Sequence, residues 1–226
     1  MRALLLVAVL FVAACASDGT VSPSQLAKTD IDRVVDAHHR AVFASLKVLA
    51  EKLYRRNPRE WRKAGLASED AAMARLFDPA TAWRLPELDD RYGTDAVLAG
   101  LREDYAGDRV AAFVGGLGGM LHDAFDDKTE FYVFDELDPQ KLHNAARNLE
   151  IADWKLANAH GADGSPLLLS NEMAPLRNLS FEREFGKMIG DLDLLSDIIA
   201  DKTNRSVVKV IQSMASAVFL PVAGVK

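Results

Sequence analysis

The pattern of hydrophobic and polar positions along this chain is helical for most of its length. Between Asp30 and Arg56, apolar side chains recur every three or four residues, which is the spacing of one face of a helix. The positions on this stripe are Ile31, Val34, Val35, His38, Val42, Ser45, Leu46, Leu49 and Leu53. The pattern predicts a helix over 30–56 with one buried face.

Local start and stop signals predict the other helices. Asn57 and Glu60 have the spacing of a capping box, Pro58 suits the first helical position, and Gly65 suits a helix end. The remaining predicted helices run from Ser68 to Asp78-Pro79, Thr94 to about Tyr105, Asp108 to about Phe125, Asp138 to His160-Gly161, Ser180 to near Asn204, and Ser206 to Phe219. Residues 79–93 are predicted to be irregular.

The short segment from Phe131 to Phe134 has a strand-like composition, but it has no convincing partner strand. It is therefore interpreted as a buried connector. These patterns together predict an all-α fold, a single globular bundle of about seven to nine helices.

One predicted helix is apolar on every side. It spans Val110 to Leu121, twelve residues, whereas a membrane span needs about twenty. We expect this glycine-rich helix at the centre of the bundle, where Ala111, Gly115 and Gly119 would let another helix approach closely. The alternative is a membrane-inserting hairpin.

The N-terminus carries a different apolar run. Arg2 precedes the stretch from Leu4 to Val12, and the run ends in Ala13, Ala14 and Cys15. This arrangement resembles the lipobox of bacterial lipoproteins. The resemblance implies that the thiol of Cys15 is diacylated, that the chain is cut after Ala14, and that the new N-terminus is acylated.

The same resemblance implies a location and a division of the chain. The residue after Cys15 is Ala16 rather than aspartate, which in this class implies sorting to the outer membrane. The predicted organisation is a cleaved signal peptide over 1–14, the lipidated cysteine with a flexible tether over 15–29, and an all-α periplasmic domain over 30–226. The lipid on Cys15 would be the only group bound covalently, and no cofactor is predicted.

Composition narrows the classes of function. Hydrophobic residues make up 49% of the 226-residue chain, enough for a substantial core. The net charge of −6 argues against general nucleic-acid binding, which needs a basic surface. Because Cys15 is the only cysteine, the mature domain can form no internal disulfide.

Some polar side chains fall on helix faces expected to be buried: His38, His122, Asp153 and His160. One hypothesis is that some of them converge on a metal or acid–base site. The other is that they are satisfied polar residues of the core, with Asp153 paired to an arginine. No single helix carries them at a metal-ligand spacing, and no metal site is predicted.

Two surface features are further candidates. Asn171, Glu172 and Arg177 lie in a polar loop that forms either a ligand-facing rim or a turn with a helix cap. A basic cluster is the other feature, and it consists of Arg55, Arg56, Arg59, Arg62 and Lys63. It is predicted to be either a solvated face or a contact for anionic headgroups or an acidic protein partner.

Three functions are consistent with these observations. The favoured one is a non-enzymatic outer-membrane lipoprotein whose periplasmic domain binds a partner or maintains the envelope. The second is a hydrolase or metal-dependent enzyme that uses the histidine and aspartate residues. The third is a membrane-active protein that uses the glycine-rich helix.

Overall fold

The computed structural model describes residues 27–173, 175 and 177–222. These residues form seven α-helices and no strand, so the predicted all-α class is confirmed. The helices are α3 (Asp30–Arg56), α4 (Pro58–Lys63), α5 (Glu69–Leu76), α6 (Thr94–Gly100), α7 (Arg109–Ala124), α8 (Pro139–Asn158) and α9 (Ser180–Thr203). No helix in this part of the chain is long and apolar enough to cross a membrane.

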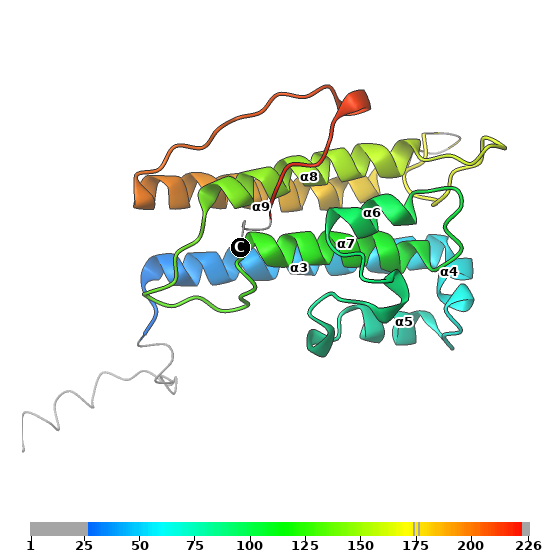
Figure 1. The fold of residues 1–226 in the computed structure, drawn as a ribbon, viewed down its shortest axis with the longest axis horizontal. Helices are drawn as coiled ribbons and strands as arrows, with labels where there is room; N and C mark the ends of the chain where they lie inside the picture. The colour runs from blue at the N-terminus through cyan, green and yellow to red at the C-terminus, as the bar shows by residue number, and fades with distance from the viewer. Residues whose placement is uncertain (1–26, 174, 176, 223–226) are drawn as a thin grey trace, which may run out of the picture.

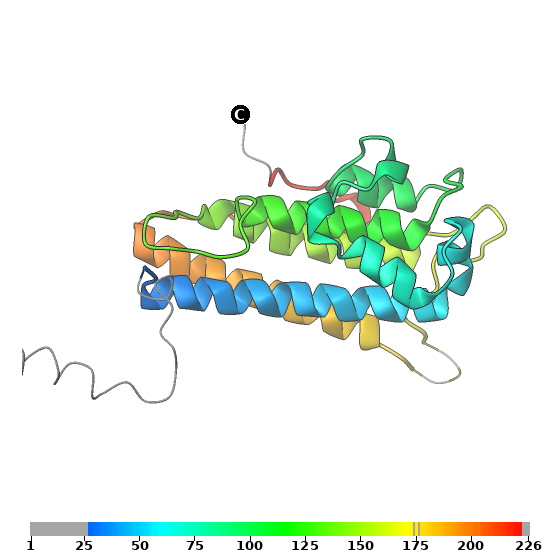
Figure 2. The same cartoon turned by 90° about the horizontal axis from the view of Figure 1, so that it is seen from below.

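The four long helices, α3, α7, α8 and α9, lie along the long axis of the molecule (Figures 1 and 2). Neighbouring helices run in opposite directions, because Tyr54 near the end of α3 contacts Asp108 at the start of α7, and Ser196 late in α9 contacts Pro139 at the start of α8. This is the up-down-up-down topology of a four-helix bundle. Buried leucines and phenylalanines of all four helices form one core.

The two ends of the bundle are named here by what they contain. At the α4 end, α3 and α8 finish, α7 and α9 begin, and α4 packs beside them. At the cavity end, α3 and α8 begin, α7 and α9 finish, and residues 125–138 connect α7 to α8. Thr29 caps α3 there in a capping box, in which Asp32 accepts the Thr29 backbone N–H.

The glycine-rich helix α7 is buried from Arg109 to Leu121, as its apolar composition predicts. A Cβ atom at Gly116 would lie 2.6 Å from backbone atoms of Gly93 and Val97, and one at Gly118 would lie 2.1 Å from the Trp83 ring. The close approach is therefore made by α6 and by the irregular segment before it, rather than by another long helix. The glycines make room for these neighbours.

Helix α6 is shorter than predicted, ending at Gly100 rather than near Tyr105. The guanidinium of Arg109 donates to the carbonyls of Gly100, Arg102 and Glu103. The buried arginine satisfies these carbonyls, so the chain can turn away from the helix without leaving them unpaired.

The predicted helix from Ser206 to Phe219 is wrong. Apart from a 3₁₀ turn at Met214–Ser216, this segment is extended and lies along α8 (Figure 1). Three side chains of α8 that are spaced four residues apart bind its backbone: Gln140 at Val208, Asn144 at Pro221 and Asn148 at Leu220. The bonds at Val208 fix the start of the segment, and those at Leu220 and Pro221 fix the chain just after it, while β-branched residues lose less side-chain freedom in an extended chain.

The connector at Phe131 is buried at only one of its ends. Phe131 is 2% exposed, but Val133 is 48% and Phe134 is 94% exposed. Asp135 accepts the Tyr132 N–H and donates its own backbone N–H to the Tyr132 carbonyl, which forms a turn. This turn directs Phe134 into solvent, so the prediction of a fully buried segment is wrong.

Candidate functional site

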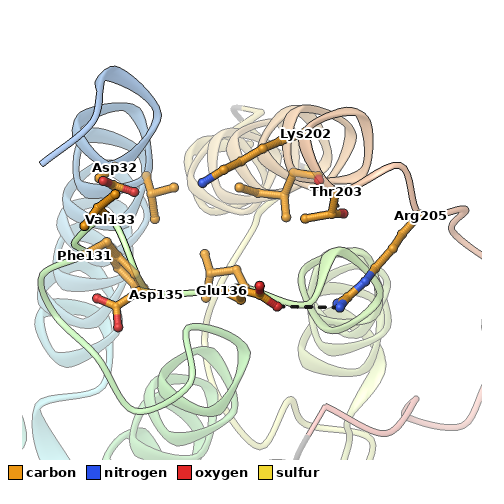
Figure 3. A pocket seen from close by; sticks show the side chains of 11 residues that line it. Asp32, Phe131, Val133, Asp135, Glu136, Lys202, Thr203 and Arg205 are labelled. Atoms are coloured by element: carbon orange, nitrogen blue, oxygen red, sulfur yellow. Dashed lines mark hydrogen bonds and ion pairs between the residues drawn. The ribbon is translucent and has the colours of Figure 1, made fainter.

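A cavity of about 290 Å³ opens at the cavity end of the bundle. It lies between the first turns of α3, the segment 131–137 and the last turn of α9 (Figure 3). Its inner wall consists of four buried apolar side chains, Val35, Phe131, Leu137 and Ile199. Three chain segments that are far apart in sequence therefore build one concave apolar surface.

Charged groups of both signs surround this apolar wall. The ammonium group of Lys202 points into the cavity and forms no ion pair with any described residue (Figure 3). Arg205 lies 3.7 Å from Glu136, a long and exposed ion pair. A small amphipathic molecule matches this arrangement, with its apolar part on the wall and its polar groups at the rim.

The acidic side chains of the cavity are partly engaged by the protein itself. Asp32 accepts the Thr29 backbone N–H at 2.7 Å, which holds the start of α3. Asp135 accepts Lys128 and the Tyr132 N–H, and the hydrogen bond from Lys128 holds the pKa of Asp135 below its ordinary value. Lys202 is thus the cavity cation that is most available to a ligand.

The histidines and the aspartate proposed from sequence lie at separate places. No hydrogen bond or ion pair among the described residues joins any two of His38, His122, Asp153 and His160. Within the same residues there is also no group of three or more histidine, cysteine, aspartate or glutamate side chains that could hold a metal.

His38 and His122 each pair with an aspartate. His38 lies half-buried between α3 and α9, with its Nδ1 3.1 Å from Asp191. His122, near the end of α7, lies 3.7 Å from Asp127 through its Nε2. The first contact joins two helices and the second lies across the turn that ends α7, and both fit the hypothesis of satisfied polar residues.

Asp153 is only partly buried, and no described residue pairs with it, so the expected arginine partner is not found. Burial, together with the charge of Glu182, raises the pKa of Asp153 to about 7. His160 lies in solvent just beyond α8, with its Nδ1 2.9 Å from the Asn158 carbonyl.

The loop candidates have structural contacts. Asn171 accepts the backbone N–H groups of Phe181 and Glu182 and so caps α9. The Glu172 carboxylate accepts hydrogen bonds from both terminal nitrogens of Arg56, with nitrogen–oxygen distances of 2.7 and 3.2 Å. Arg177 is exposed and forms no ion pair with a described residue.

Carboxylates neutralise most of the basic cluster at the α4 end. Arg55 pairs with Glu69, Arg56 with Glu172, and both Arg59 and Lys63 with Glu60. Arg62 instead lies over the Trp61 ring, with its guanidinium carbon 4.8 Å from the ring centroid. Glu60 carries a single negative charge for two cations, so this face keeps positive charge from Arg62 and from the group of Arg59, Lys63 and Glu60.

Asn57 and Glu60 have roles that the capping-box pattern did not predict. The Asn57 side chain forms no cap for α4, and it instead exchanges two hydrogen bonds with the backbone of Leu169. Glu60 is fully buried and accepts the Arg109 backbone N–H at the start of α7. Both side chains join distant segments, so their local pattern was misleading.

Sequence reasoning missed two buried histidines, His39 and His143. His39 packs against the rings of Phe43 and Phe125, and its Nε2 has no hydrogen-bond partner in the described structure. Burial, together with the smaller effect of nearby His122, lowers the pKa of His39 to about 4. A strict heptad spacing through Val35, His39 and Val42 was the signal that could have identified it.

Asp191 and Asp193 of α9 bridge to other helices. Asp191 pairs with His38 of α3, whereas Asp193 accepts Arg147 of α8 at 2.7 Å and lies 3.8 Å from His143. Cys15 and the predicted signal peptide lie outside the described residues.

Comparison of the chain with models of protein families, with curated proteins and with solved structures gives no match.

Proposed function

We propose that this protein is an outer-membrane lipoprotein whose helical domain faces the periplasm and acts as a non-enzymatic binding module. The lipobox-like sequence from Val12 to Cys15 supports the anchor. The cavity beside Lys202 supports the binding role, because it combines apolar wall residues with a cation that the domain does not pair.

The cavity also lies at the end of the domain where the chain arrives from Cys15. Ala27, the first described residue, lies three positions before the start of α3 at Asp30, and α3 supplies two of the residues that line the cavity. A ligand bound there would be held close to the anchored terminus. We propose that the ligand is a small amphipathic molecule, taken up without a chemical step.

We also propose that the glycine-rich helix α7 is the packing centre of the domain rather than a membrane-inserting segment. Its support is the burial of Val110 to Leu121 and the close packing of Trp83 and Val97 on its glycines. Inserting α7 into a bilayer would require both neighbours to separate from it.

Metabolic labelling with palmitate tests the anchor. The wild-type chain should incorporate label, and its mass should show loss of residues 1–14 and acylation of Cys15. A Cys15→Ser variant should remain an unprocessed precursor without label. Normal processing and membrane association of that variant would refute the lipoprotein assignment.

Binding of 8-anilinonaphthalene-1-sulfonate, an amphipathic anion, tests the cavity. The folded protein should bind this probe at one site, and Lys202→Glu should weaken the binding because it reverses the charge that faces the cavity. Lys209→Glu is the matched control, since Lys209 is exposed on the C-terminal segment and does not line the cavity. Equal binding by both variants would refute this site.

A further inference from the structure

The turn at 132–135 holds an aromatic side chain in solvent by several fixed contacts. Phe134 is 94% exposed, and it lies at the cavity end next to half-exposed Val133. Asp36 of α3 accepts the Phe131 N–H at 3.0 Å, and Asp135 accepts the Tyr132 N–H at 2.8 Å. The first contact ties the start of the turn to α3, and the second closes the turn on itself, so that the phenylalanine is presented outward.

The chain from the predicted anchor reaches the domain against this turn. The Val133 N–H donates to the carbonyl of Ala27 at 3.2 Å. The next residue, Lys28, lies over the Tyr132 ring and pairs with buried Asp36. The N-terminal entry point and the exposed phenylalanine therefore share one small region of the surface.

The length of chain between this entry point and the anchor is short. Eleven residues separate Cys15 from Ala27. Whatever their conformation, covalent geometry limits their span to roughly 40 Å. An acylated Cys15 would keep the turn near the bilayer surface, where even a weak apolar contact is favoured by its high effective concentration.

We propose that the 132–135 turn is a membrane contact, and that Phe134 inserts into the interfacial region of the leaflet that holds the acyl chains of Cys15. This inference rests on the proposed lipid anchor. It assigns the orientation of the domain, with the cavity end toward the bilayer and the α4 end away from it.

Charge near the turn favours an apolar contact over an electrostatic one. Glu130 and Glu136 are exposed beside it, and Lys128 is already paired with Asp135. The basic cluster at 55–63 lies at the other end of α3, whose 27 residues extend roughly 40 Å. Although Lys202 lies in the adjoining cavity without an ion pair, the turn itself is acidic, so its contact should form on neutral vesicles without anionic lipid.

Site-specific fluorescence on the mature lipidated protein tests this orientation. Because acylation occupies the only cysteine, a new cysteine can be labelled selectively with an environment-sensitive nitrobenzoxadiazole dye. A label at Phe134→Cys should shift to shorter wavelength in phosphatidylcholine vesicles and be quenched by nitroxide lipids. A label at Ile211→Cys, a position that is 98% exposed on the C-terminal segment, is the control and should remain in water.

A second label excludes an effect of the dye itself. Placed at Glu136→Cys, it should be quenched by nitroxide lipids when Phe134 is present and much less in the Phe134→Ser background. A label at Arg62→Cys, at the α4 end, reports the opposite orientation. If nitroxide lipids quenched this label and not the label at position 134, the proposal would be overturned.

The mass of the mature protein distinguishes a failure of the membrane contact from a failure of the lipid anchor, because it shows whether Cys15 is acylated. If Cys15 is acylated but the label at position 134 behaves like the one at 211, the membrane contact is wrong and the anchor stands. If Cys15 carries no acyl chain, both the anchor and the contact that depends on it are wrong.

Discussion

At the α4 end of the bundle, buried carboxylates with polar partners join three helices, whereas at the cavity end an apolar hollow and an exposed phenylalanine face solvent. Glu60 and Asp108 are at most 3% exposed and join α3, α4 and α7. At the other end, Lys202 has no partner among the described residues, and Phe134 is 94% exposed.

The two ends of the bundle therefore differ in what their side chains can contribute, folding stability at one end and ligand binding at the other. Buried charge pairs are costly to break, because the group left behind stays desolvated and unpaired. Surface apolar groups and an unpaired cation contribute little to folding, yet they can contact a ligand or a bilayer. The α4 end is therefore expected to hold the bundle together, and the cavity end is expected to carry the function.

The largest expected effect is at Glu60. Its carboxylate accepts Arg59, Lys63 and the Arg109 N–H, and it has no exposed surface. Glu60→Ala should lower the free energy of unfolding by about 3–5 kcal/mol, measured by urea denaturation. Glu51→Ala is the control, because Glu51 makes only a 3.8 Å ion pair with exposed Arg55 and should change stability by less than about 1 kcal/mol. Equal effects would contradict the claim that the buried carboxylate network of Glu60 holds the α4 end together.

A pH dependence is expected from His39, which lies toward the cavity end. Burial, with nearby His122, lowers its pKa to about 4 from an ordinary value of 6.5, so the native state favours the neutral ring. The resulting stability is complete above pH 6.5 and decreases as the pH falls toward 4, by about 3 kcal/mol in total.

Urea denaturation at several pH values measures this effect. His39→Phe should flatten the profile between pH 6.5 and 4, because phenylalanine fits among Phe43, Phe125 and Phe131 without titrating. His160→Gln, at an exposed position, should leave the profile unchanged. An unchanged profile in His39→Phe would assign the acid sensitivity to other groups.

The sequence predicted the long helices well, because their cores repeat at helical spacing over many turns. The starts of α7 and α8 were predicted from Asp108 and Asp138, and both side chains do accept a backbone N–H of the first turn. Such signals are local, so sequence alone contains them.

Predictions failed where distant residues decide the outcome. The segment after Asn204 is apolar enough for a helix, but its backbone is bound by Gln140, Asn144 and Asn148 of α8. The cavity could not be predicted, because its walls come from three segments whose positions depend on the helix packing. Phe134 is exposed for a similar reason, since Asp36 and Asp135 determine the turn.

A smaller effect is expected at Asp153, in the half of α8 nearer the α4 end. Burial and the charge of Glu182 raise its pKa to about 7 from 3.8, so the native state favours the protonated acid. Stability is therefore complete below about pH 4 and decreases as the pH rises through 7.

Asp153→Asn should raise the free energy of unfolding at pH 8 by about 1–2 kcal/mol, discounted for partial exposure, and have no effect at pH 4. Asp197→Asn, on the exposed surface of α9, is the control and should show no such difference. A loss of stability at pH 8 in Asp153→Asn would mean that the carboxylate has a favourable partner. Such a partner at Asp153 would be an ion pair or hydrogen bond that the described contacts do not include.

The smallest expected effect on stability is at Phe134. Its ring is 94% exposed, so Phe134→Ser removes almost no buried apolar surface and should change the free energy of unfolding by less than about 0.5 kcal/mol. Phe131→Ser, three residues earlier at 2% exposure, should cost about 3 kcal/mol or more, because it leaves a hole against Phe125. Urea denaturation of both variants measures the contrast within one turn. If Phe134→Ser were as destabilising as Phe131→Ser, the phenylalanine would be part of the core and unavailable to a membrane. If it is silent in folding, any loss of membrane contact in the same variant reflects the surface itself.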